Sequence, residues 1–459
     1  MTGAARAGRR CLRRALTGQS RRAWRGAKEG PMFKLAIIGF GVVGQGLAEI
    51  LIKNRDRLKY EHGFEYSVVA VSDFNKGSAY NPTGLDLAKV LYLAKENKIS
   101  EYPGVQTGWD ALDTIKKSNA DIVIEATYTN IKTAEPAYSH FKAALESGKH
   151  LVTTNKGPTA LFFREVASLA RNRRLQFRYE GTVMSGTPAL NLAEFCLVGN
   201  EIKEIRGIVN GTTNFILTNM EKGKSYADAL KEAQDLGFAE AVPDADVEGF
   251  DAMAKVIILA KAVMGADISV ADVDRTGITG ITLQDVETAR AEGKRWKLIG
   301  RVVREGGLVR ASVKPEKLDI ADPLASVGGA TNALTFRTDL MGSVTIIGAG
   351  AGKIETGYSI LVDLLAIHRI ASIEKKAAAL VKAVPVAKAA VARPRAKGVT
   401  RAAVPKRRRP KTAARKAAKK PARKIKKRTT KTRKTVRKAV RRVKKVVRRT
   451  KRTSRARTR

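Results

Sequence analysis

Three glycines with the spacing Gly39-x-Gly41-x-x-Gly44 follow a short aliphatic run and open a segment with helical spacing. In such a strand–turn–helix unit the first glycine permits the tight turn, and the third lets the helix pack on the strand. The second lets a pyrophosphate approach the backbone at the helix N-terminus, where unpaired N–H groups point at it. The sequence therefore predicts a dinucleotide site, formed by Gly39, Gly41, Val42, Val43 and Gly44.

Aliphatic runs and helical segments alternate from Met32 through the first half of the chain. Apolar runs separated by helices are typical of a parallel sheet covered on both faces. Because crossovers between parallel strands are right-handed, we predict an α/β fold with a Rossmann-type, doubly wound parallel sheet. The predicted strands are residues 34–40, 67–73, 121–127, 150–155 and 175–180, and the predicted helices are residues 42–58, 136–147 and 159–173.

The regular alternation of strand-like and helical segments ends after Gly181. A strand-like run at 202–209 is followed by helical patterns at 226–236 and 250–263, and a second strand-like run at 343–347 leads through three glycines into a helix at 358–370. We interpret this part as an α+β domain inserted before the chain returns to the first domain. The predicted boundaries are 32–179 for the dinucleotide-binding domain, 180–337 for the inserted domain and 338–372 for the return.

Asp73 ends the second predicted strand. An acid at this position hydrogen-bonds the adenosine ribose and favours NAD. Lys76 is near enough in sequence to accept a 2′-phosphate instead, so the predicted cofactor is NADP or NAD.

The charge of the chain is concentrated at its two ends. The whole chain has 87 Lys and Arg against 43 Asp and Glu, a net charge of +44. Residues 1–31 contain nine basic residues and one acid, and residues 375–459 contain 38 basic residues and no acid, so the remainder is almost neutral. The basic C-terminal tail, 373–459, has no aromatic residue and five prolines, so we expect it to be disordered in isolation.

Residues 1–31 are Arg-rich, which is similar to an organellar transit peptide; an upstream extension or a disordered basic arm is the preferred interpretation.

Cys11 and Cys196 are the two cysteines, which excludes a disulfide framework or a cysteine-based zinc site and favours the cytoplasm. We find no uninterrupted apolar stretch of about 18 residues and expect no transmembrane segment.

Asp251 and Lys255 are four residues apart within a predicted helix that is otherwise apolar all round. Their spacing puts them on one helix face. The alternative to a functional pair is a surface ion pair worth a few tenths of a kcal/mol. The apolar surroundings instead predict burial, and a buried ionisable pair indicates a functional site.

Together, these features resemble homoserine dehydrogenase, from about Met32 to Ile370. The motifs that carry the resemblance, in chain order, are Gly39–Gly44, Thr153–Pro158 (TTNKGP), Glu180–Thr187 (EGTVMSGT), Asn210–Asn214 (NGTTN), Gly237–Glu240 (GFAE), Asp246–Lys255 (DVEGFDAMAK) and Gly348–Gly352 (GAGAG). The resemblance implies reversible NAD(P)-dependent oxidation of L-homoserine to L-aspartate 4-semialdehyde, in threonine and methionine biosynthesis. It further implies that the inserted domain is a catalytic and dimerisation domain, and that the protein is a homodimer through the segment around 311–336.

The resemblance also assigns roles to individual residues. Lys255 is implied as the general acid/base, and Glu240, Asp251 and Lys156 as substrate-binding residues. A free lysine titrates at about 10.4, so the base needs a pKa lowered by desolvation, which Glu240 and Asp251 oppose. Residues implied to touch the dinucleotide are Thr127, Lys156, Gly237 and Gly350, and those implied to bind a sodium ion, mainly through carbonyls, are Glu180, Val183, Ser185 and Thr187.

The sequence departs from the family pattern at three positions. Val242 stands where Asp is common, and Met253-Ala254 replaces the common Ala-His before Lys255. Neither change removes a proposed catalytic group, although Val242 could alter substrate affinity. The chain resembles the short form of the family without the regulatory ACT domain, so we expect no threonine feedback through that domain.

The composition of the basic tail resembles linker-histone and bacterial histone-like tails and predicts sequence-independent binding to nucleic acid. Val436, Val440, Val443 and Val447 have helical spacing, so this part could fold once its charges are neutralised. The alternatives are an anionic membrane surface, ribosomal RNA or a fusion without a selected role. A working dehydrogenase associated with the nucleoid is therefore one hypothesis, and a nucleic-acid-coating protein with a vestigial dehydrogenase body is the other. The intact set Lys156, Glu240, Asp251 and Lys255 favours the enzyme.

Overall fold

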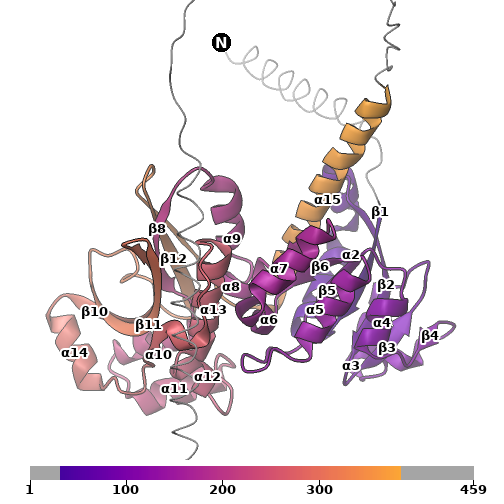
Figure 1. Ribbon diagram of the computed structural model, residues 1–459. Helices are drawn as coiled ribbons and strands as arrows, with labels where there is room; N and C mark the ends of the chain where they lie inside the picture. Colours follow the sequence, from indigo (N-terminus) through magenta and orange to yellow (C-terminus); the bar gives the residue numbers. More distant parts are fainter. Residues whose placement is uncertain (1–31, 384–459) are drawn as a thin grey trace, which may run out of the picture. The chain divides into compact units, whose positions relative to one another are not determined.

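A computed structural model describes residues 32–383, which form two β-sheets with their helices (Figure 1). The first sheet has seven strands in the order β4-β3-β2-β1-β5-β6-β7. Strands β2, β1, β5, β6 and β7 run parallel, while β3 and β4 add an antiparallel edge that the sequence did not reveal. The strands are β1 (Met32–Ile38), β2 (Glu65–Asp73), β3 (Gly77–Tyr80), β4 (Gln106–Thr107), β5 (Ile122–Glu125), β6 (His150–Thr153) and β7 (Phe177–Arg178).

Alternate residues of β1 supply the two faces of this sheet, as expected from the period of a strand. Leu35 and Ile37 are buried in one cluster with residues of α2 (Val42–His62) and α15 (Lys353–Ala383), whereas Ile38 is buried in another with residues of α5 (Ala137–Glu146) and α7 (Phe163–Asn172). The sheet is therefore covered on both faces, which confirms the predicted Rossmann-type arrangement. The helices of this domain are α2 (Val42–His62), α3 (Leu87–Lys95), α4 (Ala111–Lys117), α5 (Ala137–Glu146), α6 (Lys156–Leu161), α7 (Phe163–Asn172) and α15 (Lys353–Ala383).

The second sheet has six strands in the order β13-β12-β8-β10-β11-β9, all antiparallel except the β11–β9 pair. Its long hairpin turns at Gly306 and Gly307, whose positive φ angles of 57° and 83° suit a two-residue hairpin turn. One face of the sheet packs against the apolar helix α13 (Phe250–Ala262), in the largest hydrophobic cluster within residues 32–383.

The strands of the second sheet are β8 (Ile202–Ile208), β9 (Val273–Arg275), β10 (Lys294–Glu305), β11 (Leu308–Asp319), β12 (Thr331–Thr338) and β13 (Ser343–Ala349). The α-helices of this domain are α8 (Gly181–Met184), α9 (Ala189–Asn191), α10 (Gly211–Met220), α11 (Tyr226–Asp235), α12 (Asp244–Val247), α13 (Phe250–Ala262) and α14 (Leu283–Ala291).

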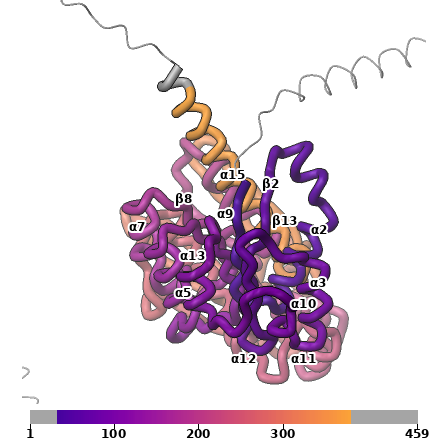
Figure 2. The backbone as a smooth tube through the Cα atoms, turned by 90° about the vertical axis from the view of Figure 1, so that its right-hand side faces the viewer, coloured from indigo at the N-terminus to yellow at the C-terminus, as the bar shows by residue number. Residues whose placement is uncertain are grey.

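The chain returns to the first domain later than the predicted residue 338. Strand β13 still belongs to the six-stranded sheet, and α15 is the first element back on the first domain. Helices α2 and α15 approach closely: a Cβ on Gly357 would come within 2.7 Å of the Leu47 nitrogen. In Figures 1 and 2 the orange C-terminal helix lies beside the indigo N-terminal part of the chain.

Two further helices differ from the prediction. The predicted helix 159–173 is two helices, α6 and α7, joined at Phe162, and α6 begins at Lys156 because Asn155 caps it with a side-chain bond to Gly157 N at 3.1 Å. The last helix extends well beyond the predicted 358–370. The predictions for residues 1–31 and for the tail after residue 383, including Val436, Val440, Val443 and Val447, lie outside the described residues.

Helix α15 contains, among residues 32–383, one stretch that is long and apolar enough to cross a membrane by length and composition alone, Lys353–Ala379. Half of the 18-residue apolar window within that stretch is buried inside the protein. Ile360, Leu364 and Ile367 belong to the core of the first domain, which accounts for the apolar character of the helix.

Candidate functional site

The glycine loop joins β1 to α2 and has the geometry that the three glycines predict. Gly39 has a φ of +86°, and a Cβ there would lie 2.5 Å from the carbonyl oxygen of Ala126. A Cβ on Gly44 would lie 2.5 Å from the Gly39 oxygen, so both positions require glycine for packing. Gly41 differs, because a Cβ there meets nothing within 4 Å. The open space lies at the N-terminus of α2, where the first N–H groups are free to bind a diphosphate.

Asp73 fixes the backbone around this loop. One carboxylate oxygen accepts from Phe40 N at 2.7 Å, and the other accepts from the N–H groups of Asn75 and Lys76, both at 3.0 Å. The Lys76 ammonium donates to the Asn97 side chain at 2.9 Å. Asp73 is therefore held at the end of β2, beside the glycine loop.

Thr127 follows β5 and borders the same loop. Its hydroxyl donates to the buried carboxylate of Glu125, and its carbonyl oxygen accepts from Asn155 Nδ2 at 3.3 Å. Asn155 also caps α6, so one side chain links the end of β5 to the first turn that carries Lys156.

Lys255, Asp251 and Lys156 form the central cluster. Asp251 Oδ2 lies 2.7 Å from Lys255 Nζ, and Asp251 Oδ1 lies 3.3 Å from Lys156 Nζ. Lys255 also donates to the carbonyl oxygen of Val209, at 2.6 Å. One carboxylate thus bridges two ammonium groups, one on α13 and the other on α6 of the first domain.

Burial determines the electrostatics of this cluster. The flanking residues of α13, including Ala254 and Val256, are buried, and Lys255 itself is only 6% exposed. Burial lowers the pKa of Lys255 from 10.5, while the neighbouring Asp251 carboxylate opposes that change. Burial alone would raise the pKa of Asp251, but the charges of Lys255 and Lys156 outweigh it and hold that pKa below 3.8.

Asn210 and Asp246 join the cluster, although neither was predicted to have a role of its own. Asn210 Nδ2 donates to Asp246 at 2.7 Å and to Asp251 at 3.1 Å. Its oxygen accepts from Thr213 N at 2.9 Å, so the same amide caps α10. Burial, followed by the charge of Asp251, raises the pKa of Asp246. The signal in the sequence was the N-cap pattern of Asn210 before the Gly-Thr-Thr start of a helix.

Glu240 and Gly237 lie in the exposed loop after α11. A hydrogen bond of 2.7 Å from the Thr212 hydroxyl to the Phe238 carbonyl ties this loop to α10. Between residues 32 and 383, no hydrogen bond or ion pair is made by the Glu240 carboxylate. The structure therefore brings together Lys156, Asp251 and Lys255 but leaves Glu240 outside their contacts.

The four sodium candidates lie between β7 and the α9 region. Both Glu180 carboxylate oxygens accept backbone N–H groups, from Leu190 at 3.0 Å and Asn191 at 2.6 Å. Ser185 has a φ of +52°, and Thr187 donates to the Ala349 carbonyl at 3.0 Å. Val183 is buried in α8. Within the described range, no group of three or more His, Cys, Asp or Glu side chains could hold a metal ion.

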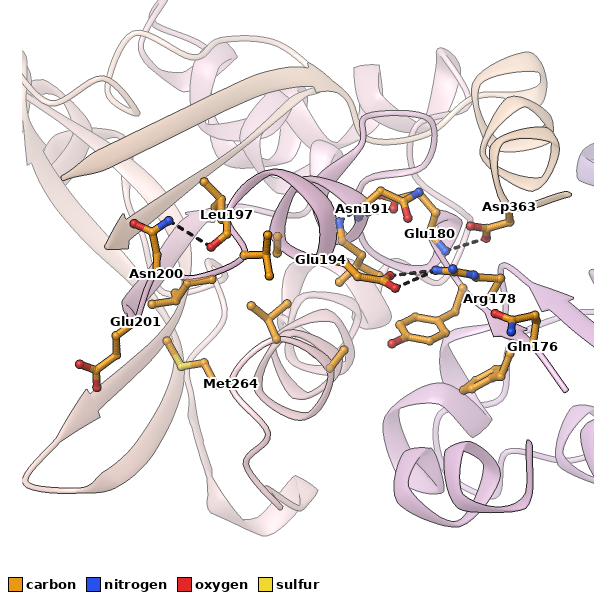
Figure 3. Close-up of a pocket in the computed structure, with 18 of the residues that line it drawn as sticks. Gln176, Arg178, Glu180, Asn191, Glu194, Leu197, Asn200, Glu201, Met264 and Asp363 are labelled. Atoms are coloured by element: carbon orange, nitrogen blue, oxygen red, sulfur yellow. Dashed lines mark hydrogen bonds and ion pairs between the residues drawn. The ribbon is translucent and has the colours of Figure 1, made fainter. Parts of the chain in front are cut away.

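A cavity of about 630 Å³ adjoins Glu180 (Figure 3). Arg178 points into it and pairs with Glu194 at 2.8 Å, while Asp363 of α15 accepts from Glu180 N at 2.9 Å. Burial raises the pKa of Glu180 to about 7 and that of Asp363 to about 8. The cavity reaches the C-terminal end of α13, whereas Asp251 and Lys255 lie in the first half of that helix.

Comparisons with known proteins agree with this geometry. The family model described as "Homoserine dehydrogenase, NAD binding domain" matches residues 39–180, and the model "Homoserine dehydrogenase" matches residues 188–365. The NAD(+)-dependent homoserine dehydrogenase of Pseudomonas canavaninivorans is 46% identical over 74% of this chain and 97% of that protein. The homoserine dehydrogenase of Methanocaldococcus jannaschii is 42% identical over 73% of this chain and 98% of that protein.

Solved structures of homoserine dehydrogenases are also similar to this chain. A homoserine dehydrogenase from Thiobacillus denitrificans matches with a TM-score of 0.66 at 31% identity, over 75% of both chains. A hyperthermophilic archaeal homoserine dehydrogenase mutant in complex with NADPH matches with a TM-score of 0.64 at 30% identity, over 75% of this chain and 98% of that chain.

A Rossmann-type sheet with an open glycine loop, joined to a second domain that presents a buried lysine, defines an NAD(P)-dependent oxidoreductase. Within that class, the length and identity of the matches decide the family. The chain belongs to the homoserine dehydrogenase family.

Proposed function

We propose that this chain oxidises L-homoserine reversibly to L-aspartate 4-semialdehyde with NAD or NADP, and that Lys255 is its general base. The observation that carries the assignment is the bridge formed by Asp251 between the ammonium groups of Lys255 and Lys156. The bridge lies where the two domains meet, because α6 belongs to one and α13 to the other.

The residues of the first domain fit a nicotinamide dinucleotide. The open space at Gly41 and the free N–H groups of the first turn of α2 suit a diphosphate, and Val42 and Val43 supply that turn. Asp73 would face the adenosine ribose, with Thr127 as a further contact, and Gly237 of the loop after α11 and Gly350 after β13 would add contacts from outside the first domain. A nicotinamide dinucleotide bound there would supply the acceptor for the hydride of the substrate carbon that carries the hydroxyl.

Proton transfer is the task of Lys255. The hydroxyl of homoserine loses its proton as the hydride leaves, so Lys255 must be neutral when it accepts that proton. Burial favours the neutral form by lowering the pKa of Lys255. Asp251 then stabilises the ammonium that forms on Lys255, and the Val209 carbonyl orients this ammonium by accepting a hydrogen bond from it.

The substrate meets charges of both signs at this cluster. Lys156 is 27% exposed and supplies a cation for the substrate carboxylate, while Asp251 and Glu240 supply anions for its ammonium. Glu240 lies on a loop that a hydrogen bond ties to α10, and we assign it to binding the substrate ammonium from that loop.

The test is the homoserine-dependent reduction of NAD+ and NADP+ by the full chain and by Lys255→Met. Methionine keeps the unbranched stem but cannot accept a proton. We expect the variant to lose about 100- to 10,000-fold in kcat, the range for a positioned general base, while its affinity for NAD+ stays within about twofold. A folded wild-type protein without activity on either cofactor would contradict the proposal.

We infer that the protein is a homodimer through the second sheet. The segment 311–336 supplies most of β11 and part of β12, and the neighbouring hairpin exposes Leu340, Met341 and Ile347 at 73%, 61% and 55%. Sedimentation of the wild-type protein and of Met341→Asp tests this, because a charge in an apolar interface favours the monomer.

We further propose Glu180, Val183, Ser185 and Thr187 as a sodium site through their carbonyls. The test is the melting temperature in NaCl compared with that in choline chloride.

We also infer that residues 375–459 bind nucleic acid, on the basis of 38 basic residues without an acid. Binding of a labelled DNA duplex and of an RNA of equal length is compared between the full chain and a chain ending at Glu374. We expect affinity only in the full chain, with a steep linear fall of log K with log salt. Equal dehydrogenase activity of both chains would make the tail an accessory, and equal DNA affinity of both would contradict the inference.

A further inference from the structure

Asn332 on β12 has a fully buried side chain whose amide nitrogen and oxygen both lack a hydrogen-bond partner among the described residues. Its exposed fraction is 0%. A buried amide of this kind loses its bonds to water without replacement, so proteins seldom keep one unless another group joins it. The folded protein would be more stable with an apolar side chain of the same size at this position.

The register of β12 locates the amide. Ala333 pairs with Ile208, the last residue of β8, so Asn332 lies beside the start of the loop formed by Val209 and Asn210. Val209 gives its carbonyl oxygen to Lys255. Leu334 belongs to the core that contains the apolar residues of α13, and Asn332 is two residues away, so both side chains point to the same face of the sheet.

The glycine-rich segment 348–352 lies on the other side of Asn332. Asn332 pairs with Gly348 on β13, and a Cβ on Gly350 would overlap the Asn332 amide group. The same segment continues to Lys353, whose carbonyl a Cβ on Gly46 of α2 would overlap. The Asn332 amide therefore lies between the Val209 carbonyl, which accepts a hydrogen bond from Lys255, and the segment 348–353, which reaches α2.

We propose that Asn332 binds the carboxamide of the nicotinamide ring and thereby fixes which face of the ring meets the substrate. A carboxamide offers one N–H donor group and one C=O acceptor, which match the two unpaired groups of Asn332. The carboxylate of homoserine only accepts and its ammonium only donates, so either would leave half of Asn332 unpaired. Because Gly350 covers the amide, segment 350–352 moves aside when the ring enters, and glycine gives it that freedom.

This inference rests on the proposed function, and the experiment separates the two. The variant is Asn332→Leu, which removes both hydrogen-bonding groups at nearly constant volume. The matched control is Asn214→Leu, because Asn214 is also buried but donates to the carbonyls of Val327 and Thr331 at 3.2 and 3.1 Å. Affinities for NAD+ and for ADP-ribose, which lacks the nicotinamide, are measured by calorimetry alongside melting temperatures of the unliganded proteins.

We expect Asn332→Leu to keep or raise the melting temperature, to bind ADP-ribose as the wild type does, and to bind NAD+ about tenfold more weakly. Asn214→Leu should melt at a lower temperature without a selective loss of NAD+ affinity. Unchanged NAD+ affinity in Asn332→Leu would overturn the inference, whether homoserine KM rises or not. If the wild type binds neither NAD+ nor ADP-ribose, the proposed function itself fails.

Discussion

Lys156 and Asp251 lie on helices of different domains, and 3.3 Å separates Lys156 Nζ from Asp251 Oδ1. A second contact fixes the same pair of helices, since Lys261 near the end of α13 donates to the Ala160 carbonyl of α6 at 2.7 Å. The position of Lys156 therefore depends on how α6 packs on α13, and not on the ion pair alone.

Lys156→Met should raise the KM for homoserine at least about tenfold while the protein stays folded, because a partly exposed ion pair adds at most about 1 kcal/mol of stability. Steady-state kinetics and thermal melting measure the two effects. Arg164→Gln is the matched control, since Arg164 pairs with Asp267 at 3.1 Å, also between the domains, but far more exposed. Equal KM values in both variants would contradict a substrate role for Lys156.

The pH dependence of homoserine oxidation should follow the protonation of Lys255. A neutral base is required, so kcat/KM should rise with pH, and burial places that rise below the ordinary lysine pKa of 10.5. Asp251→Asn removes the negative charge that raises the pKa of Lys255, so the residual activity of this variant should rise at a lower pH than the wild type. A rise at the same or a higher pH would exclude Lys255 as the titrating group.

Asn210 should influence the same profile through Asp251. Asn210→Ala removes the α10 cap and two hydrogen bonds to carboxylates, a loss of about 2–4 kcal/mol in the free energy of unfolding. Asn210→Asp retains an N-cap acceptor but adds a carboxylate near Lys255, which raises the lysine pKa. We expect the Asp variant to be the more stable of the two and its activity to rise at higher pH than the wild type. Urea unfolding and pH profiles distinguish them.

Two single-methyl substitutions test the glycine loop. Gly39→Ala must be strained because φ is +86° and the added Cβ meets the Ala126 carbonyl, so we expect a loss of about 1–3 kcal/mol in stability. Gly41→Ala has a negative φ of −75° and free space, so its stability should be unchanged. Its methyl group would occupy the space expected for the diphosphate and should weaken NAD+ binding about tenfold or more. Calorimetry that shows full NAD+ affinity in Gly41→Ala would locate the diphosphate elsewhere.

The sequence predicted those features that depend on neighbouring residues. The glycine loop, the parallel strands and the buried position of Lys255 follow from local spacing and from the apolar character of residues 250–260. The hairpin β10–β11 was not predicted, because charged residues occur along its strands and find partners far away in the chain. Arg301 on β10, for example, pairs with Glu204 on β8 at 2.5 Å.

The contacts of Asn332 and Lys156 depend on tertiary packing in the same way. Asn332 follows a segment without a clear hydrophobic period, and its position under Gly350 arises from the pairing of β12 with β13. Lys156 falls between the predicted strand 150–155 and the predicted helix 159–173, but the side chain of Asn155 caps a helix that begins at the lysine. Local pattern identifies a candidate residue, whereas the distance between two candidates depends on how separate elements pack.

The order of elements along the chain has a consequence for biosynthesis. Ile360, Leu361, Leu364 and Ile367 complete the core around α2, yet they follow the whole six-stranded sheet in sequence. On a ribosome, the N-terminal sheet emerges first, and the part of its apolar core that α15 covers stays exposed until α15 has been translated. The core of the first domain is therefore completed only after every strand of the second domain has been made, although the glycines of its loop are made first.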